Sequence, residues 1–546
     1  MMTIQRLKRW VKENKTILLI LTGVIFLCYV NTLDNRFVSD DFPGIAENPN
    51  LGKFSYVFRH PLRFLRPFFY FVIHSLFGKI PAPFRMLNIL FHLGNSILLF
   101  TITRHILNKR TATISSILFA VHPLMTESVT WITGGIYSQH TFFFFLSFAF
   151  YLKADNKKSN YPLSLLFFGL TLISSIKAFT TGLIFPFYEF TQKKLRKNLN
   201  KYLPHLLGTA AFALYFGAQI GDRIGKLQTK FYQQGGSYFR PFVQVPTALA
   251  RYLELLFWPR DLSLYQKGFP NYWLAVIITA VYLGLLIYIY QKNKRIFFFF
   301  SLFLVALLPF LTPFRIAWHV AERYCYLASV GIIVPFAFVI DNLLTRGGKC
   351  ISRLGTVFLI LAVCGLIART IIRNNDWQNR NTLWPATAKV APENPKLHNN
   401  LGDVYAQKGN LQKAASEFEL ATKLLPGYAD AYHNWGNVLR RQGKTEQAIE
   451  KYQQAISHNP QLWQSHSILA EIYFNQENFE KAKNHFSRSV NIYPKNIETW
   501  FNLAITYSNL NQHEKAINII ENLSAQDPGN EKIKTLRERI YQQYEN

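Results

Sequence analysis

Apolar and polar positions divide the chain of 546 residues into two parts with different periodicities. To about residue 372, long apolar runs alternate with short polar connections, and beyond it the sequence has the pattern of amphipathic helices. Runs of about 17–25 apolar residues are long enough for a helix to cross a bilayer. Such runs, with one shorter run at 178–191, predict about eleven spans: near 16–33, 84–103, 111–130, 136–152, 161–176, 178–191, 202–220, 272–290, 296–313, 324–341 and 353–372.

One further apolar stretch, 243–259, contains Arg251 and Glu254. An ionised pair at bilayer depth is costly, so we expect this helix to lie on the membrane surface. With the N-terminus inside, every inner connection then carries Lys or Arg residues, as the positive-inside rule requires. The same topology places the C-terminal part on the extracytoplasmic side.

The polar part repeats at a constant interval, as the equal spacing of Pro392, Pro426, Pro460, Pro494 and Pro528 shows. Within each repeat, two positions hold small residues and a third holds a large one: Gly402, Gly436, Ala470 and Ala504; Ala414, Ala448, Ala482 and Ala516; and Phe418, Tyr452, Phe486 and Ile520. Small residues let paired helices approach closely, and Pro ends the second helix. This is the tetratricopeptide (TPR) pattern, whose period is about 34 residues. It predicts an α-solenoid of four repeats over 395–528, with a connecting half-repeat at 373–394 and a capping helix at 529–546.

Composition and charge narrow the class of protein. The net charge of +29 could indicate nucleic-acid binding, but the Lys and Arg residues lie mostly in short clusters between apolar runs. That distribution orients a membrane protein, so we expect a lipid bilayer and no nucleic acid as partner. The four cysteines have neither pairing nor metal-ligand spacing, so no disulfide or metal centre is predicted. The fold class is therefore all-α: a polytopic membrane bundle followed by TPR repeats.

Candidate chemistry collects in the outer segments of this topology. Asp40 and Asp41 are adjacent carboxylates in the first outer loop, 34–83. Arg66 lies in an amphipathic stretch of that loop, and Lys177 lies in a short outer link. The other candidates are His122, Glu127, Arg315, His319, Glu322 and Arg323. Each alone could be an interfacial anchor or a helix cap, but together they predict a cavity at one membrane face.

Four segments resemble the transmembrane-and-TPR protein O-mannosyltransferases, multi-span enzymes of the GT-C glycosyltransferase superfamily with extracytoplasmic TPR repeats. They are Phe-Val-Ser-Asp-Asp ending at Asp41, the segment 118–129 with its His-Pro-Leu-Met-Thr-Glu, Trp-Pro-Arg-Asp-Leu-Ser at 258–263, and 321–329 with its Ala-Glu-Arg-Tyr. The resemblance covers nearly the whole chain in the same domain order. One departure is Lys177-Ala178, where the family usually has Lys-Glu.

The resemblance implies transfer of a sugar, mannose or another hexose, from a polyprenyl-phosphate donor to hydroxyl groups of protein acceptors, with inversion favoured. Such chemistry needs a carboxylate to take the acceptor proton and cations to hold the leaving phosphate. We assign Asp40 and Asp41 as catalytic, with Asp41 the preferred base. The donor phosphate is assigned to Lys177, Arg315, Arg323 and, more weakly, Arg66, and the site is lined by His122, Glu127, His319 and Glu322. No cofactor beyond the lipid-linked donor is expected, and metal dependence stays open.

Two other functions stay open. One is a GT-C relative that glycosylates a glycan or lipid, and the other is an inactive membrane-anchored TPR scaffold. Acids and arginines on one face argue against the scaffold, whereas Ala178 in place of Glu leaves it open. The predicted location is a bacterial inner membrane facing the periplasm, or an ER membrane facing the lumen in a eukaryote.

The TPR part has candidate acceptor-binding residues of its own. Asn400, Asn434 and Asn502 occupy one position of the first helices. In the similar TPR array of the nucleocytoplasmic O-GlcNAc transferase, Asn at this position forms a ladder along the concave groove. An amide both donates and accepts, so it can bind the backbone of a protein or peptide acceptor. The alternative is that these residues satisfy neighbouring helix carbonyls.

Overall fold

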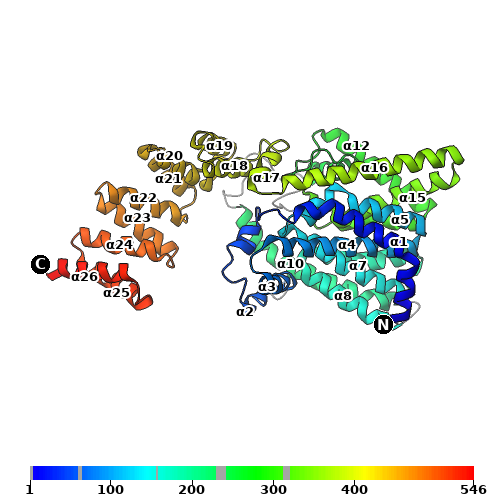
Figure 1. Ribbon diagram of the computed structural model, residues 1–546, viewed down its shortest axis with the longest axis horizontal. Coiled ribbons are helices and arrows are strands. Elements are labelled where there is room, and N and C mark those ends of the chain that lie inside the picture. The colour runs from blue at the N-terminus through cyan, green and yellow to red at the C-terminus, as the bar shows by residue number, and fades with distance from the viewer. Residues whose placement is uncertain (1–3, 60–63, 155–157, 229–240, 312–319, 546) are drawn as a thin grey trace. The chain divides into compact units, whose positions relative to one another are not determined.

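The computed structural model describes residues 4–59, 64–154, 158–228, 241–311 and 320–545, and regular structure within these ranges is entirely helical (Figure 1). The expected all-α class is therefore confirmed. The chain forms two compact units, the first made of residues 1–224 and 238–391 and the second of 392–546 with the short segment 225–237. Each unit is described by itself.

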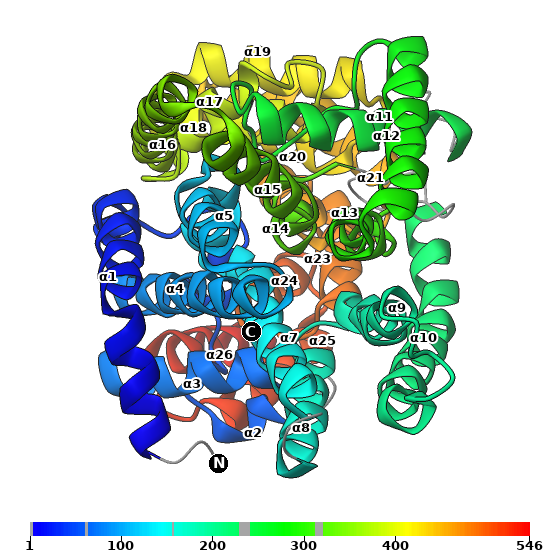
Figure 2. The same ribbon diagram turned by 90° about the vertical axis from the view of Figure 1, so that its right-hand side faces the viewer.

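The first unit is a bundle of apolar helices. Its longer helices are α1 (Ile4–Tyr29), α3 (Leu65–Phe77), α4 (Pro81–Ile106), α5 (Lys109–Val121), α7 (Ile136–Ala154), α8 (Tyr161–Ser174), α9 (Ile184–Thr191), α10 (Leu199–Gln228), α11 (Pro241–Phe257), α12 (Tyr272–Lys292), α13 (Lys294–Leu307), α15 (Val330–Arg346), α16 (Lys349–Asp376) and α17 (Arg380–Ala388). Helix α4 packs against α1, α5 and α7, and these helices lie together in Figure 2.

Four helices of the described part are long and apolar enough to cross a bilayer: Lys8–Thr32, Pro81–Ile106, Tyr272–Lys292 and Lys349–Asp376. A fifth candidate is a pair bent by 54°, in which Glu322–Ala328 precedes α15. These five coincide with predicted spans. The other predicted crossings fall on helices that are shorter or less apolar, so the total of about eleven stays a prediction.

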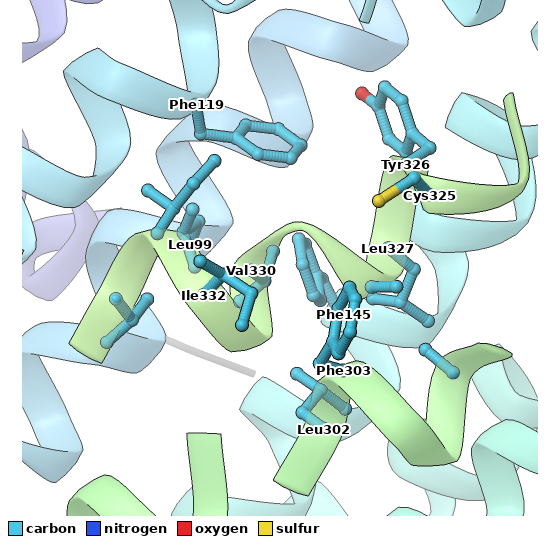
Figure 3. Packing of buried hydrophobic residues seen from close by; sticks show 14 of the residues in the cluster. Leu99, Phe119, Phe145, Leu302, Phe303, Cys325, Tyr326, Leu327, Val330 and Ile332 are labelled. Atoms are coloured by element: carbon cyan, nitrogen blue, oxygen red, sulfur yellow. The ribbon is translucent and has the colours of Figure 1, made fainter. Parts of the chain in front are cut away.

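The core of the first unit lies where α4, α5, α7, α13 and α15 meet (Figure 3). The Phe119 and Tyr326 rings pack edge to face at 5.3 Å in this core. Gly331 allows α15 to approach α13, because a Cβ atom there would lie 2.3 Å from the backbone nitrogen of Phe303. Close packing of this kind fixes the helix ends from which the candidate site is built.

The second unit repeats one helical hairpin. Its helices are α18 (Pro395–Gln407), α19 (Leu411–Leu424), α20 (Ala429–Arg441), α21 (Thr445–His458), α22 (Trp463–Asn475), α23 (Phe479–Ile492), α24 (Ile497–Asn509), α25 (His513–Gln526) and α26 (Glu531–Glu545). The first helix of each hairpin begins at the same position of its repeat, and each second helix ends two residues before the Pro that closes the repeat.

Small and aromatic residues meet inside the repeats as the sequence predicts. A Cβ atom at Gly402 would lie 2.6 Å from the Phe418 ring, and one at Gly436 would lie 2.7 Å from the Tyr452 ring. Both rings are buried. The glycines therefore give the aromatic side chains the space that they fill.

Replacing Phe418 by Ala should destabilise the first repeat by about 3–5 kcal/mol, because a buried aromatic side chain leaves a cavity. Hydrogen exchange of α18 and α19 measures the loss. Leu420 lies on the same helix but is 38% exposed, so Leu420→Ala should change protection little. Equal effects of the two substitutions would contradict this packing.

Candidate functional site

The two adjacent carboxylates of the first outer loop have different environments. Asp41 is fully buried, and its Oδ2 accepts from the Val38 N–H at 3.2 Å while its Oδ1 accepts from the Thr133 N–H at 2.9 Å. The Asp40 side chain is exposed. Ser39 has a φ of 49°, in the left-handed region that non-glycine residues rarely adopt. The chain reverses at this residue, so one carboxylate anchors the loop and the other faces outward.

Burial raises the pKa of Asp41 from 3.8 to about 6. The N–H groups of Thr133 and Val38 and the charge of Arg85 act in the opposite direction, because each favours the carboxylate form. The loop thus holds the Asp41 carboxyl group where burial disfavours its charged form and the neighbouring N–H groups favour it.

A buried arginine joins this loop to the turn that contains Thr133. Arg85, near the start of α4, donates from Nε to the Thr130 carbonyl at 2.8 Å and from Nη1 to the Asn35 carbonyl at 2.7 Å. Its Nη2 donates to the Arg36 carbonyl at 3.1 Å. The rigid guanidinium fork thereby satisfies three backbone acceptors from two distant segments.

The same turn is held by two more side chains. Asn88, one turn after Arg85 on α4, donates to the Trp131 and Ile132 carbonyls, both at 3.2 Å. The Tyr70 hydroxyl on α3 also donates to the Ile132 carbonyl, at 3.1 Å. Arg66 donates to that hydroxyl at 3.2 Å and is half-buried. The Tyr70 side chain therefore connects Arg66 to the turn.

Glu127 and Arg323 form a buried ion pair. Glu127 Oε2 also accepts from the Arg323 N–H at 2.8 Å. The guanidinium lies over the rings of Trp131 and Tyr324, at 5.4 and 4.9 Å from their centroids. The chain therefore uses Arg323 to join the segment 126–129 to the segment 322–324.

Glu322 forms a second buried ion pair, with Arg373 at 3.4 Å near the end of α16. It also accepts from Gln266 Nε2 at 3.0 Å and from the Ser263 N–H. Arg373 donates to Asp376 at 2.9 Å. The segment 258–266 is thus tied to both Glu322 and α16.

His122 acts as a cap between two helices. The Leu124 N–H donates to its Nδ1 at 3.2 Å, so the ring proton is on Nε2, which donates to the Leu256 carbonyl at 2.9 Å. Both ring nitrogens are engaged.

Lys177 lies among aromatic rings. Its Nζ is 4.7 Å from the centroid of Tyr324, 5.2 Å from that of Phe310 and 3.5 Å from the Tyr137 hydroxyl. Arg315 and His319 lie outside the described residues. Among the residues searched, no three His, Cys, Asp or Glu side chains gather where they could hold a metal ion.

Sequence reasoning missed Arg85 and Arg373. Both lie close to the ends of apolar runs, where an arginine commonly reaches towards water. Here both guanidinium groups are fully buried instead. The sequence did contain one indication: a charged residue beside a predicted membrane span commonly pairs with another polar group.

The three asparagines of the TPR unit are half-buried on their first helices. Asn434 donates to the Asn399 side chain at 3.0 Å, so it links the first two repeats. The side chains of Asn400 and Asn502 have no hydrogen-bond partner within the described ranges.

Comparisons with known proteins find matches for segments of both units. Residues 59–218 match the model of the dolichyl-phosphate-mannose-protein mannosyltransferases, and 395–428, 436–476 and 476–540 match tetratricopeptide repeat models. The human protein O-mannosyl-transferase TMTC3 is 24% identical over 74% of this chain and 51% of its own length. Human TMTC4 is 25% identical over 73% of this chain and 65% of its own length. The chain spans about half the length of the TMTC3 relatives it matches.

Solved structures match the repeats. YrrB, described as a TPR protein with an unusual peptide-binding site, is 18% identical with a TM-score of 0.29 and covers 30% of this chain and 84% of its own. A MamA protein is 19% identical with a TM-score of 0.25 and covers 28% of this chain and 84% of its own.

The chain thus combines a segment that matches the mannosyltransferase model, in a unit rich in apolar helices, with TPR repeats. Its resemblance to the transmembrane-and-TPR protein O-mannosyltransferases is confirmed.

The raised pKa of Asp41 predicts how the stability of the fold depends on pH. Because this pKa is about 6 in the folded protein and near 3.8 in an exposed chain, folding takes up a proton between these values. The contribution of Asp41 to stability is therefore complete below about pH 4 and is lost as the pH rises through about 6. Asp41→Asn carries no charge, so its stability relative to wild type should rise over this range by up to about 3 kcal/mol.

Protection of the Val38 and Thr133 amides, corrected for intrinsic exchange rates, measures this difference. Glu47→Gln is the control, because Glu47 is an exposed carboxylate of the same loop. A difference between Asp41→Asn and wild type that does not change with pH would contradict the assignment.

Proposed function

We propose that this protein is an integral-membrane glycosyltransferase that moves a hexose from a polyprenyl-phosphate donor to hydroxyl groups of protein acceptors. The names of the relatives support mannose as the sugar. The observation that carries the proposal is the pairing of an exposed carboxylate, Asp40, with a neighbour that is completely engaged in holding the loop. An accessible base on a rigid loop is what transfer to an external hydroxyl requires.

The geometry favours Asp40 over Asp41 as the base. In the proposed reaction, the acceptor hydroxyl gives its proton to Asp40 while its oxygen forms a bond to the anomeric carbon. The bond from that carbon to the phosphate oxygen breaks, and the polyprenyl phosphate leaves with the electron pair. Attack opposite to the leaving group inverts the configuration. Asp41 is then a positioning residue that fixes the backbone from which Asp40 projects.

Cations stabilise the charge that develops on the leaving phosphate. Arg66 is more accessible to a donor phosphate than Arg323 is, because Arg66 is half-buried and its one hydrogen bond within the described residues is to Tyr70. Lys177 is the second cation, held by cation–π contacts. We assign Arg323 to positioning, since its guanidinium pairs with Glu127. Arg315 and His319 stay candidates.

The bilayer delivers the donor, so the site needs no nucleotide-binding loop. We place the Asp40 loop and the TPR unit on the extracytoplasmic side, and we assign the binding of acceptor segments to the TPR unit. Asn400, Asn434 and Asn502 bind the acceptor backbone in this proposal.

One experiment separates the three functions. Membranes that contain the protein are incubated with radiolabelled polyprenyl-phosphate mannose and, in parallel, with the glucose-bearing donor. Label on protein supports the proposal. Label on lipid or glycan alone indicates the second function, and no transfer from any donor indicates a scaffold.

Asp40→Asn should lower transfer by about 10²–10⁴-fold, the usual contribution of a general base. Folding should be unchanged because the side chain is exposed. Glu47→Gln removes another exposed carboxylate from the same loop and should keep nearly full activity. Full activity of Asp40→Asn would remove Asp40 from the mechanism.

The acceptor role of the TPR unit is tested by replacing Asn400, Asn434 and Asn502 together with Ala. Each lost hydrogen bond weakens binding by about 1 kcal/mol, so kcat/KM for a full-length protein acceptor should fall about tenfold or more. Transfer to a short peptide should be unchanged. The control replaces Asn484, Asn518 and Asn522, which are exposed on second helices. Equal loss on both acceptors would indicate a folding role instead.

A further inference from the structure

A pocket of about 430 Å³ lies between three helices of the first unit. Its lining includes Trp10 of α1, Arg104 and His105 of α4, and Lys153 of α7. Ile102 and Leu152 add apolar walls. Three of these six residues are basic or can become so, and the described residues of the lining include no carboxylate.

The pocket and the Asp40 loop lie at opposite ends of α4. Arg85 binds the loop near the start of this helix, whereas Arg104 lies near its end. Nineteen residues of α-helix rise about 28 Å. The hydrocarbon core of a bilayer is about 30 Å thick, and α4 is long and apolar enough to cross it. A bilayer that α4 crosses would have the Asp40 loop at one face and the pocket at the other.

The basic side chains that line the pocket suit the binding of an anion. Arg104 donates from Nη1 to Asn14 at 2.7 Å, and Asn14 in turn donates to the Trp10 carbonyl at 2.7 Å. This contact fixes the guanidinium and uses one of its five N–H groups. Lys153 of α7 lines the same pocket and is half-buried. A guanidinium fork and an ammonium group that line one pocket match the oxygens of a phosphate.

We propose that this pocket binds the phosphate-bearing headgroup of an anionic phospholipid, in the leaflet opposite to the Asp40 loop. The chemistry of a phosphate could equally come from a soluble ion, but the apolar walls favour a lipid. Trp10 has the amphipathic ring that residues at a membrane interface commonly present. The headgroup would hold α1, α4 and α7 together at this face. The inference does not depend on the proposed catalytic function.

Native mass spectrometry of the full-length protein in detergent tests the proposal by titration with phosphatidylglycerol, phosphatidylcholine and inorganic phosphate. We expect phosphatidylglycerol to bind more tightly than phosphatidylcholine. Arg104→Gln with Lys153→Gln should weaken phosphatidylglycerol binding about 25-fold, since each basic residue near an anionic lipid contributes about fivefold. Lys109→Gln with Arg110→Gln removes two exposed basic residues just beyond α4 and should leave the affinity unchanged.

Lys153→Gln alone should weaken binding about fivefold. This variant keeps the test valid if loss of the Arg104–Asn14 contact impairs folding. Equal affinity for the two lipids, or wild-type affinity in Lys153→Gln, would overturn the proposal. Complete displacement of phosphatidylglycerol by millimolar inorganic phosphate would overturn the lipid assignment and indicate a site for a soluble anion.

Discussion

The backbone of residues 130–133 is the feature on which the first unit depends. Side chains from α3, α4 and the first outer loop bond four of its buried peptide groups: the carbonyls of Thr130, Trp131 and Ile132 and the N–H of Thr133. A buried peptide group without a partner costs about 1–3 kcal/mol, so the loss of any one contact loosens the others. The position of Asp40 is therefore set by residues that never face solvent.

Buried ion pairs add further connections between distant segments of the first unit. Glu127–Arg323 and Glu322–Arg373 connect segments about 50 to 200 residues apart in the sequence. Removing one partner of such a pair leaves an uncompensated charge, which is strongly destabilising. The motifs that resemble a glycosyltransferase family thus supply much of the architecture of the site. Among the described residues, the groups that we propose to meet a substrate are fewer: Asp40, Arg66 and Lys177.

The repeats were predictable in detail, since a constant repeat length fixes which positions face each other, and Gly402 and Phe418 meet as that period requires. The all-helical bundle followed from its apolar runs. The division of roles between Asp40 and Asp41 was not predictable, because it depends on the left-handed backbone of Ser39 and on the Thr133 amide 92 residues away. Likewise, the partner of Arg323 lies 196 residues earlier, and no local pattern encodes that distance.

Successive TPR hairpins contact each other through the second helix of one and the first helix of the next. A duplicated hairpin could therefore enter the array without any new interface having to evolve. Gene duplication within this region would lengthen the groove by one whole hairpin at a time and leave the membrane unit untouched. Under the proposed function, reach towards an acceptor and chemistry at the bilayer could in this way change independently of each other.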